Sequence, residues 1–300
     1  MDFTGEKYRQ LLLALRRGGY EFVPFRDYIV SREPAPIPAL ALENSKKENG
    51  YAARASDDAA PDGTLPGARW KRVILRHDVD RLPENSLRLA RLEHELRVTG
   101  TYYFRIVPES YDRQIMKEIA GLGHEIGYHY EDVDLASQRS KVKSKKLSED
   151  DLIDQAYESF RRNLETLRKD FDVTTACMHG SPRSKYDNRI IWRKYNYRDL
   201  SITGEPYFDV DFNELAYFTD SGRRWNGDKV TLRDKVNSKY SFDFKSTQEI
   251  IDNIDMLPDE LMFTIHPQRW TDTLIPWTKE LVGQDVKNLA KGFLVARSRA

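Results

Sequence analysis

The sequence predicts an α/β fold built on a parallel sheet, either open or closed into a barrel. From residue 71 onward, short runs of β-forming residues alternate with segments whose apolar residues recur at helical spacing. The chain has 300 residues, a length that single β/α barrels often occupy. Hydrophobic residues make up 39% of it, which is enough for a sizeable core. We therefore expect one domain over residues 1–300.

The first elements precede this alternating region. Residues 6–17 predict a helix, because three leucines lie at helical spacing and Gly18-Gly19 stops the pattern. A short strand is expected at residues 20–25. Residues 32–69 are rich in Ala, Pro, Gly and charge and have no clear period. A segment of this composition cannot supply a core element, so we expect a mobile insertion there.

The alternating region predicts five strands and five helices. Strands are expected at residues 73–75, 101–107, 125–129, 173–180 and 261–266. Helices are expected from Pro83, over 115–122, after Ser148, after Ser246 and over 274–291. Pro83 suits the first turn of a helix, where a missing N–H costs nothing. Ser148 with Asp151, and Ser246 with Glu249, have the spacing of capping boxes.

The charge composition argues against two classes of partner. Lys and Arg number 48 and Asp and Glu also number 48, so the formal net charge is zero. We therefore expect no bulk attraction to nucleic acid or to anionic lipid. The apolar run LLLAL near the N-terminus is too short for a signal peptide, and no stretch approaches the ~20 apolar residues of a membrane span. These features favour a cytoplasmic protein.

Four of the six histidines fall at or just after the end of an apolar strand. The carboxyl ends of parallel strands meet at one edge of an open sheet or one rim of a barrel. These histidines are therefore expected to lie near one another, although the strands are far apart in the sequence. The other two, His94 and His124, are expected to be a surface residue on a helix and a turn residue. The four strand-end histidines are His77, His129, His179 and His266.

His129 and the aspartates of "VILRHDVD" suggest a metal site. Asp78 and Asp80 are two positions apart, which places both carboxylates on one face of a strand. One of them can bind a metal while the other stays available as a base. Imidazole and carboxylate suit a borderline divalent cation such as zinc. The alternative is a charged turn whose aspartates cap the helix that begins at Pro83.

Four segments occur in the order seen in the polysaccharide deacetylase superfamily, the NodB-like carbohydrate esterases. They are "VILRHDVD", "GHEIGYHYE", "CMHGSPRSKYDN" and "FTIHPQRW". The chain resembles this family over roughly residues 71–270. The resemblance implies a distorted β/α barrel that uses a divalent metal to remove N-linked or O-linked acetyl groups from sugars. It is similar above all to divergent members associated with cell-surface polysaccharides such as O-antigen or capsule.

The resemblance also implies roles for the residues of the first two motifs. Asp78 matches the general base and Asp80 a metal ligand, although the family's pair is adjacent and here Val79 intervenes. His129 matches the first metal histidine. Four residues later the family has a second metal histidine, where this chain has valine. Of the two nearby substitutes, Glu131 and Asp134, we expect Glu131 to be the third ligand.

The later motifs imply an acid and substrate contacts. His266 matches the strand-end histidine that acts as general acid. His179 lies where the family has an arginine, with Arg183 close by, and is expected to orient Asp78 or to contact substrate. Asp220, in "FTDSGRRW", is a candidate for a sugar-binding platform, with a plain surface loop as the alternative. Trp270 is a candidate for the wall of a pocket.

Other kinds of chemistry have weaker support. Cys177, the only cysteine, lacks an activating setting and is expected to be a buried core residue. Ser181 is not in a nucleophile elbow. The basic run at 138–148 is expected to be a solvated loop, or a contact for an anionic carrier. The expected substrate is a nucleotide-linked or lipid-linked acetylated sugar. A metal hydrolase of another amide or ester, and a non-catalytic sugar-binding relative, stay open as alternatives.

Overall fold

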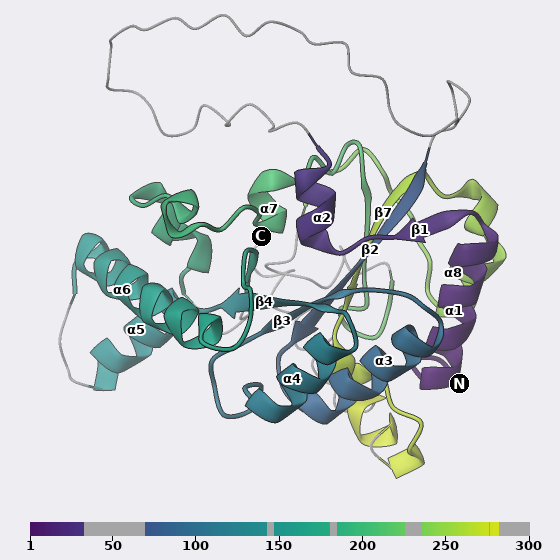
Figure 1. Ribbon diagram of the computed structural model, residues 1–300, viewed down its shortest axis with the longest axis horizontal. Coiled ribbons are helices and arrows are strands. Elements are labelled where there is room, and N and C mark those ends of the chain that lie inside the picture. Colours follow the sequence, from purple (N-terminus) through teal and green to yellow (C-terminus); the bar gives the residue numbers. More distant parts are fainter. Residues whose placement is uncertain (33–69, 143–146, 181–184, 226–235, 276, 282–300) are drawn as a thin grey trace, which may run out of the picture.

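A computed structural model of the chain shows one sheet of seven parallel strands (Figure 1). It describes residues 1–32, 70–142, 147–180, 185–225, 236–275 and 277–281. The strand order is β5-β4-β3-β2-β7-β6, and β1 pairs with the beginning of β2. The strands are β1 (Tyr20–Phe22), β2 (Lys71–Val79), β3 (Thr101–Phe104), β4 (Glu125–Tyr130), β5 (Ala176–Met178), β6 (Ala216–Thr219) and β7 (Glu260–Ile265).

Helices connect the strands and pack around the sheet (Figure 1). Helix α1 lies beside α8, α3 beside α4, and α5 beside α6. The helices are α1 (Gly5–Arg17), α2 (Phe25–Val30), α3 (Pro83–Glu95), α4 (Arg113–Gly121), α5 (Asp132–Val142), α6 (Glu149–Arg168), α7 (Pro206–Asp209) and α8 (Thr247–Asp252). Short 3-10 helices span Asn188–Arg193, Tyr197–Leu200, Ile254–Met256 and Pro267–Arg269. Among the residues that the structure describes, no helix is long and apolar enough to cross a membrane.

Most of the expected elements are present, with several differences. Helix α5 was not expected, and residues 138–142 of the basic run, which we expected to be a loop, belong to it. The short strand near the N-terminus ends at Phe22, and Phe25 already begins α2. Strand β2 runs to Val79, so His77 and Asp78 lie within the strand and not after it. Strand β6 was not expected. The predicted insertion falls almost entirely on residues 33–69, which lie outside the described residues, as does the second half of the helix expected at 274–291.

The sheet is strongly curled, and side chains from distant strands show this directly. Asp80 follows β2 and His179 follows β5, three positions away in the strand order. In a flat sheet that separation would be about 14 Å, because neighbouring strands lie about 4.8 Å apart. The carboxylate of Asp80 nevertheless lies 3.1 Å from the imidazole of His179. The fold class expected from the sequence, α/β with a distorted β/α barrel, is confirmed as a half-barrel of parallel strands.

The concave face of the sheet is filled at its amino end and carries polar side chains at its carboxyl end. Helix α2 closes the amino end, where Phe25 N–H donates to the hydroxyl of Thr101 at the start of β3. Above it lies a small apolar core that includes Ile74 and Tyr103. Glycine is required at position 127, because a Cβ atom there would lie 2.4 Å from the Tyr103 ring. The carboxyl end is therefore the part of the concave face that is left for chemistry.

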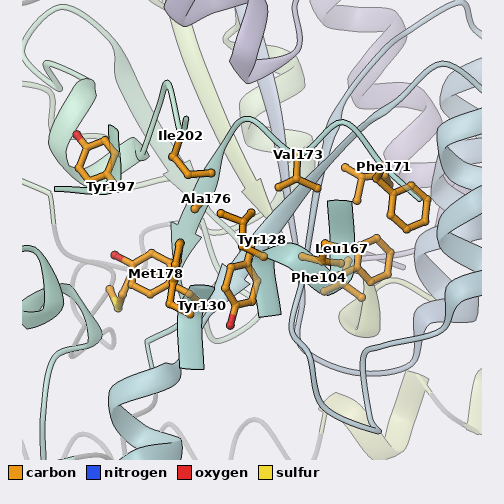
Figure 2. Close-up of a cluster of buried hydrophobic side chains, with 14 of the residues drawn as sticks. Phe104, Tyr128, Tyr130, Leu167, Phe171, Val173, Ala176, Met178, Tyr197 and Ile202 are labelled. Atoms are coloured by element: carbon orange, nitrogen blue, oxygen red, sulfur yellow. The ribbon is translucent and has the colours of Figure 1, made fainter. Parts of the chain in front are cut away.

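The convex face of the sheet holds the larger apolar cores. One of them packs β3, β4 and β5 against helix α6 and the segment after it, and Figure 2 shows part of it. There Phe104, Tyr128 and Tyr130 lie with Leu167 and Val173, all of them buried. These aromatic and β-branched residues explain why short strands are stable here, since large apolar side chains on one face anchor each strand. The strand ends that carry the polar site are fixed by this packing.

His77 belongs to a buried polar network on the convex face of the sheet. Its Nε2 atom lies 2.8 Å from the Glu93 carboxylate, and its ring stacks on Tyr102 with centroids 3.9 Å apart. The hydroxyls of Tyr8 and Tyr102 donate to the same carboxylate. Burial by itself raises the pKa of Glu93, but His77 and the other donors more than offset it, so the pKa is lowered. His77 therefore has a structural role on the face opposite to Asp78.

Replacement of Glu93 by glutamine should destabilise the fold. The carboxylate accepts from buried donors, and a buried donor left without its acceptor costs about 1–3 kcal/mol, so we expect the free energy of unfolding to fall by at least about that amount. The matched control is Glu95→Gln, whose side chain is 61% exposed and pairs with Arg9. There we expect a loss below about 1 kcal/mol. Denaturant unfolding measures both, and equal losses in the two variants would contradict the role given to Glu93.

The effect of Glu93 should also depend on pH. Its pKa in the folded protein lies below the ordinary value of 4.5. The ionised form therefore contributes stability that is fully present above pH 4.5 and is lost as the pH falls through the folded-state pKa. The difference in stability between the wild type and Glu93→Gln should accordingly narrow in acid.

Candidate metal centre and active site

Polar side chains gather at the carboxyl end of the curled sheet. They come from the ends of six different strands, or from the residues directly after those ends. Because the strands are parallel and the sheet is curled, these ends face one another across the rim. The residues are Asp78 and Asp80 of the β2 end, Arg105 after β3, His129 and Glu131 of the β4 end, His179 after β5, Asp220 after β6 and His266 after β7.

Asp80, His129 and His179 form a compact group of potential metal ligands. One ligand atom from each lies within 4.8 Å of the others. Asp80 Oδ1 is 3.1 Å from His179 Nδ1 and 3.5 Å from His129 Nε2, and the two imidazole nitrogens are 3.2 Å apart. One oxygen and two nitrogens that converge in this way fit a borderline divalent cation such as zinc.

Neighbouring groups orient two of these side chains, His129 and Asp80, toward the common point. The Nδ1 atom of His129 donates to the backbone carbonyl of Cys177 at 3.0 Å, which leaves Nε2 available as a ligand. Gln268 donates to Asp80 Oδ2 at 2.9 Å. The other oxygen, Asp80 Oδ1, is buried and accepts no hydrogen bond of normal geometry from the described residues. An ion bound between the three side chains would satisfy this oxygen.

The charge states of the group also suit a cation. Burial by itself raises the pKa of Asp80, but His179 and His129 outweigh it and hold that pKa well below its usual range. Burial lowers the pKa of His179, but the Asp80 carboxylate outweighs it, so the net shift is upward. Asp80 is therefore ionised near neutral pH, and a bound divalent cation would take the place of the proton that His179 otherwise shares with it.

Glu131, the expected third ligand, is not brought into this group. Both of its oxygens accept from Arg105, with Nε and one terminal nitrogen each 2.8 Å away. Arg105 also donates to the backbone carbonyl of Asp80 at 2.9 Å. Glu131 thus holds an arginine that links the loops after β2 and β4, and His179 occupies the third position instead. Asp134 lies farther along α5, where Asn188 donates to it.

Asp78 lies beside the metal group but is paired differently. Arg76, two residues earlier on the same strand, donates to both of its oxygens at 2.9 and 2.6 Å. Both side chains are buried. Burial raises the pKa of Asp78, but Arg76 and His129 outweigh it, so the pKa is lowered and the carboxylate stays ionised near neutral pH. Its Oδ2 atom lies 3.8 Å from His129 Nε2, which places an ionised carboxylate next to the metal group.

His266 faces this cluster from β7 and is held by Asp220. Its Nδ1 atom lies 2.6 Å from Asp220 Oδ1, and its backbone N–H donates to Asp220 Oδ2 at 2.9 Å. Arg269 and the indole of Trp270 donate to the same carboxylate. The His266 ring is close enough to help lower the pKa of both Asp78 and Asp80. With Nδ1 bound to Asp220, His266 Nε2 is available for proton transfer.

Two of the remaining residues that we expected to contact substrate, Asp220 and Trp270, are not found in the surroundings expected for them. Asp220 is fully buried and is not part of a surface loop. Trp270 is also buried, packed against Phe3 and Tyr8, and supports Asp220 instead of forming the wall of a pocket. Arg183 lies outside the described residues.

Three contributors were not anticipated from the sequence: Arg76, Arg105 and Gln268. Arg76 could have been found, since residues two apart on a strand share a face and an arginine beside an aspartate can pair with it. The contacts of Arg105 and Gln268 with Asp80 cross from one strand end to another. Such contacts depend on the curl of the sheet and leave no local signal.

Among known proteins, the chain is similar to a few solved structures. No family model and no curated protein matches the chain. The similar structures include a mutant of a CE4 family pseudoenzyme with restored enzymatic activity, at 16% identity and a TM-score of 0.36. They also include the wild-type pseudoenzyme from Bacillus anthracis, at 16% identity and the same TM-score. The alignments cover 74% of this chain and 64% and 62% of those chains, less than two thirds of their length. What this chain does is therefore inferred from its own side chains.

Proposed function

We propose that the chain is a metal-dependent hydrolase that removes an acetyl group from a sugar. The observation that carries the proposal is the convergence of Asp80, His129 and His179 on one point, beside an ionised Asp78 and a His266 held by Asp220. A ligand group, a carboxylate base and a histidine acid within one cluster are what amide hydrolysis by an activated water requires. A protein that only binds sugars has no need for this combination.

The residues around the metal group divide the chemistry between them. A divalent metal held by the three ligands would polarise the acetyl carbonyl and lower the pKa of a water molecule. Asp78 accepts a proton from the attacking water, and Arg76 keeps that carboxylate ionised and fixed in orientation. His266 donates a proton from Nε2 to the leaving amine, while Asp220 holds the ring through Nδ1. The base and the acid for water attack and amine departure thus come from the ends of two neighbouring strands, β2 and β7.

The finer features of the proposal come from the sequence. We propose zinc as the metal and an N-acetyl or O-acetyl sugar as the substrate. The sugar would be linked to a nucleotide or a lipid carrier in a cytoplasmic step of cell-surface polysaccharide biosynthesis, such as that of O-antigen or capsule. The order of the four motifs supports the sugar substrate. The zero net charge gives no support for a nucleic-acid partner.

The function is tested by assaying the metal-loaded protein on a panel of substrates. The panel contains free, nucleotide-linked and lipid-linked N-acetyl sugars, their O-acetyl counterparts, and simple amides and esters without a sugar. We expect release of acetate from an acetylated sugar, and loss of that release after chelation of the metal. Cleavage of only the sugar-free amides or esters would replace the proposal with a different hydrolase. Metal binding without any turnover would make the chain a non-catalytic relative.

His266→Ala should slow the cleavage of an amide much more than that of an activated ester. An amine leaves poorly unless it is protonated, whereas the leaving group of an activated ester needs little acid help. We expect a loss of about 10²–10⁴-fold in kcat for the amide, the usual contribution of general acid catalysis. Metal content should be unchanged, because His266 is not a ligand. Parallel rate measurements check this, and equal losses on both substrates would show that His266 positions the substrate or the fold.

A further inference from the structure

A thiol lies on the inner side of the proposed metal centre. Cys177 is paired in register with His129 across β4 and β5, so both side chains point to the concave face of the sheet. The Cys177 sulfur, a nitrogen of His129 and an oxygen of Asp78 all lie within 4.8 Å of one another. All three residues are buried. This second group of potential ligands lies deeper in the half-barrel than the group that contains Asp80.

The spacing of this inner group is close to that of a bound metal site. Ligand atoms at about 2.0–2.3 Å from one tetrahedrally coordinated ion lie about 3.3–3.8 Å apart, and the three atoms here already lie within 4.8 Å of one another. Only a small side-chain shift is therefore needed for the three atoms to bind one cation. Cys177 already holds His129 through its carbonyl group, which directs His129 Nε2 toward the cluster.

The inner and outer groups share His129 and differ in their third kind of ligand. The outer group offers one carboxylate oxygen and two imidazole nitrogens, and the inner group offers oxygen, nitrogen and sulfur. One imidazole nitrogen binds one metal ion at a time, so the two positions exclude each other. Thiolate ligands select soft metals, whereas imidazole and carboxylate suit borderline and harder ones.

We infer that Asp78, His129 and Cys177 form an inner position for a soft, thiophilic divalent cation, for which cadmium is the probe. Arg76 restricts this position to such cations. Its guanidinium group donates to both oxygens of Asp78, so a cation bound there has to share the carboxylate with a positive charge. A strong bond to sulfur can offset that repulsion, but a hard ion such as magnesium gains no such bond.

Occupation of the inner position by a cation should inhibit the hydrolysis, an expectation that rests on the proposed function. A cation bound to Asp78 occupies the carboxylate that accepts the proton from water, and it also takes His129 from the outer group. Cadmium should therefore inhibit the hydrolysis, and Cys177→Ser should reduce that inhibition. Binding itself is measured without any substrate, so a failure of the inner position can be told apart from a failure of the proposed function.

The test is a cadmium titration of the full-length, metal-free protein, followed by the ultraviolet charge-transfer band between sulfur and cadmium. Cys177 is the only cysteine in the chain, so any such band reports on it alone. We expect the wild type to develop the band and to saturate with one cadmium ion. His179→Ala should keep the band, since that residue belongs only to the outer group. Asp78→Asn and His129→Ala should weaken binding by at least about 10-fold, the lower end of the losses seen for perturbed metal sites.

Three outcomes would overturn the inference. The first is the absence of the band in the wild type at saturating cadmium. The second is a band of undiminished affinity in Asp78→Asn, which would show that the thiol binds cadmium without the carboxylate. The third is loss of the band in His179→Ala. Asp78→Asn preserves the shape of the side chain, and thermal unfolding of each variant confirms that it is folded before the titration.

Discussion

His179→Ala is expected to remove the metal from the protein and, with it, the hydrolytic activity. His179 supplies one of three ligand atoms that lie within 4.8 Å of one another, and no other described carboxylate, thiol or imidazole is placed to complete a second group with both Asp80 and His129. Loss of an outer partner of a ligand already costs about 10–100-fold in metal affinity, so loss of the ligand itself should cost at least about 100-fold. Equilibrium dialysis followed by elemental analysis measures this affinity.

Two control variants make this result specific. His94→Ala removes an exposed histidine whose Nδ1 atom contacts the Leu122 carbonyl, and it should leave metal content unchanged. Glu131→Gln disturbs only the arginine that supports the loops, so it should cost about 10-fold or less, the lower end for an outer partner. If Glu131→Gln lost more metal than His179→Ala, the ligand assignment would be wrong and Glu131 would return as the third ligand.

Asp78→Asn is expected to abolish most of the turnover while the outer metal stays bound. A carboxamide cannot accept the proton from water, and loss of a general base typically lowers kcat by about 10²–10⁴-fold. The outer group does not include Asp78, so zinc content should match that of the wild type. Single-turnover rates and elemental analysis on the same sample separate the two effects.

The opposite pattern would exchange the roles of the two aspartates. If Asp78→Asn lost its zinc and Asp80→Asn kept it, Asp78 would be the ligand and Asp80 the base. The pairing of Asp78 with Arg76 argues against this exchange, because both oxygens of Asp78 already accept hydrogen bonds from a buried guanidinium. Asp80 has one buried oxygen that still lacks such a partner.

The sequence predicted the strand-end location of the site because that location follows from local patterns. An apolar run that ends in His129, His179 or His266 is visible without any tertiary information, and parallel strands bring such ends together. The same rule misplaced His77. Side chains alternate along a strand, so His77 points to the convex face while Asp78 points to the concave one. Because β2 continues to Val79, this alternation still applies at His77.

The structure places Glu131, the expected third ligand, away from the metal group for a different reason. Glu131 is close to His129 in the sequence, and that proximity made it the natural substitute for a missing histidine. In the structure it is Arg105, from the neighbouring strand end, that decides where Glu131 points. His179 reaches Asp80 only because the sheet curls across four strands, a tertiary property that no local pattern records.

Asp220 shows how a buried role can be hidden in a polar segment. The run "FTDSGRRW" has the composition of a surface loop, yet Asp220 is fully buried at the end of β6. Four donors compensate for its burial: the backbone and ring of His266, Arg269 and the indole of Trp270. All four donors lie in the chain from 266 to 270, so the partners of Asp220 could not be identified before β6 and β7 were known to be neighbours.

The most direct test of the metal centre is anomalous X-ray diffraction at the zinc edge from crystals of the zinc-loaded protein. The ligand assignment predicts one strong peak, within coordination distance of Asp80 Oδ1, His129 Nε2 and His179 Nδ1, and it predicts Glu131 still bound to Arg105. A zinc ion coordinated by Glu131, or a peak that does not contact both His129 and His179, would contradict the assignment and the mechanism built on it.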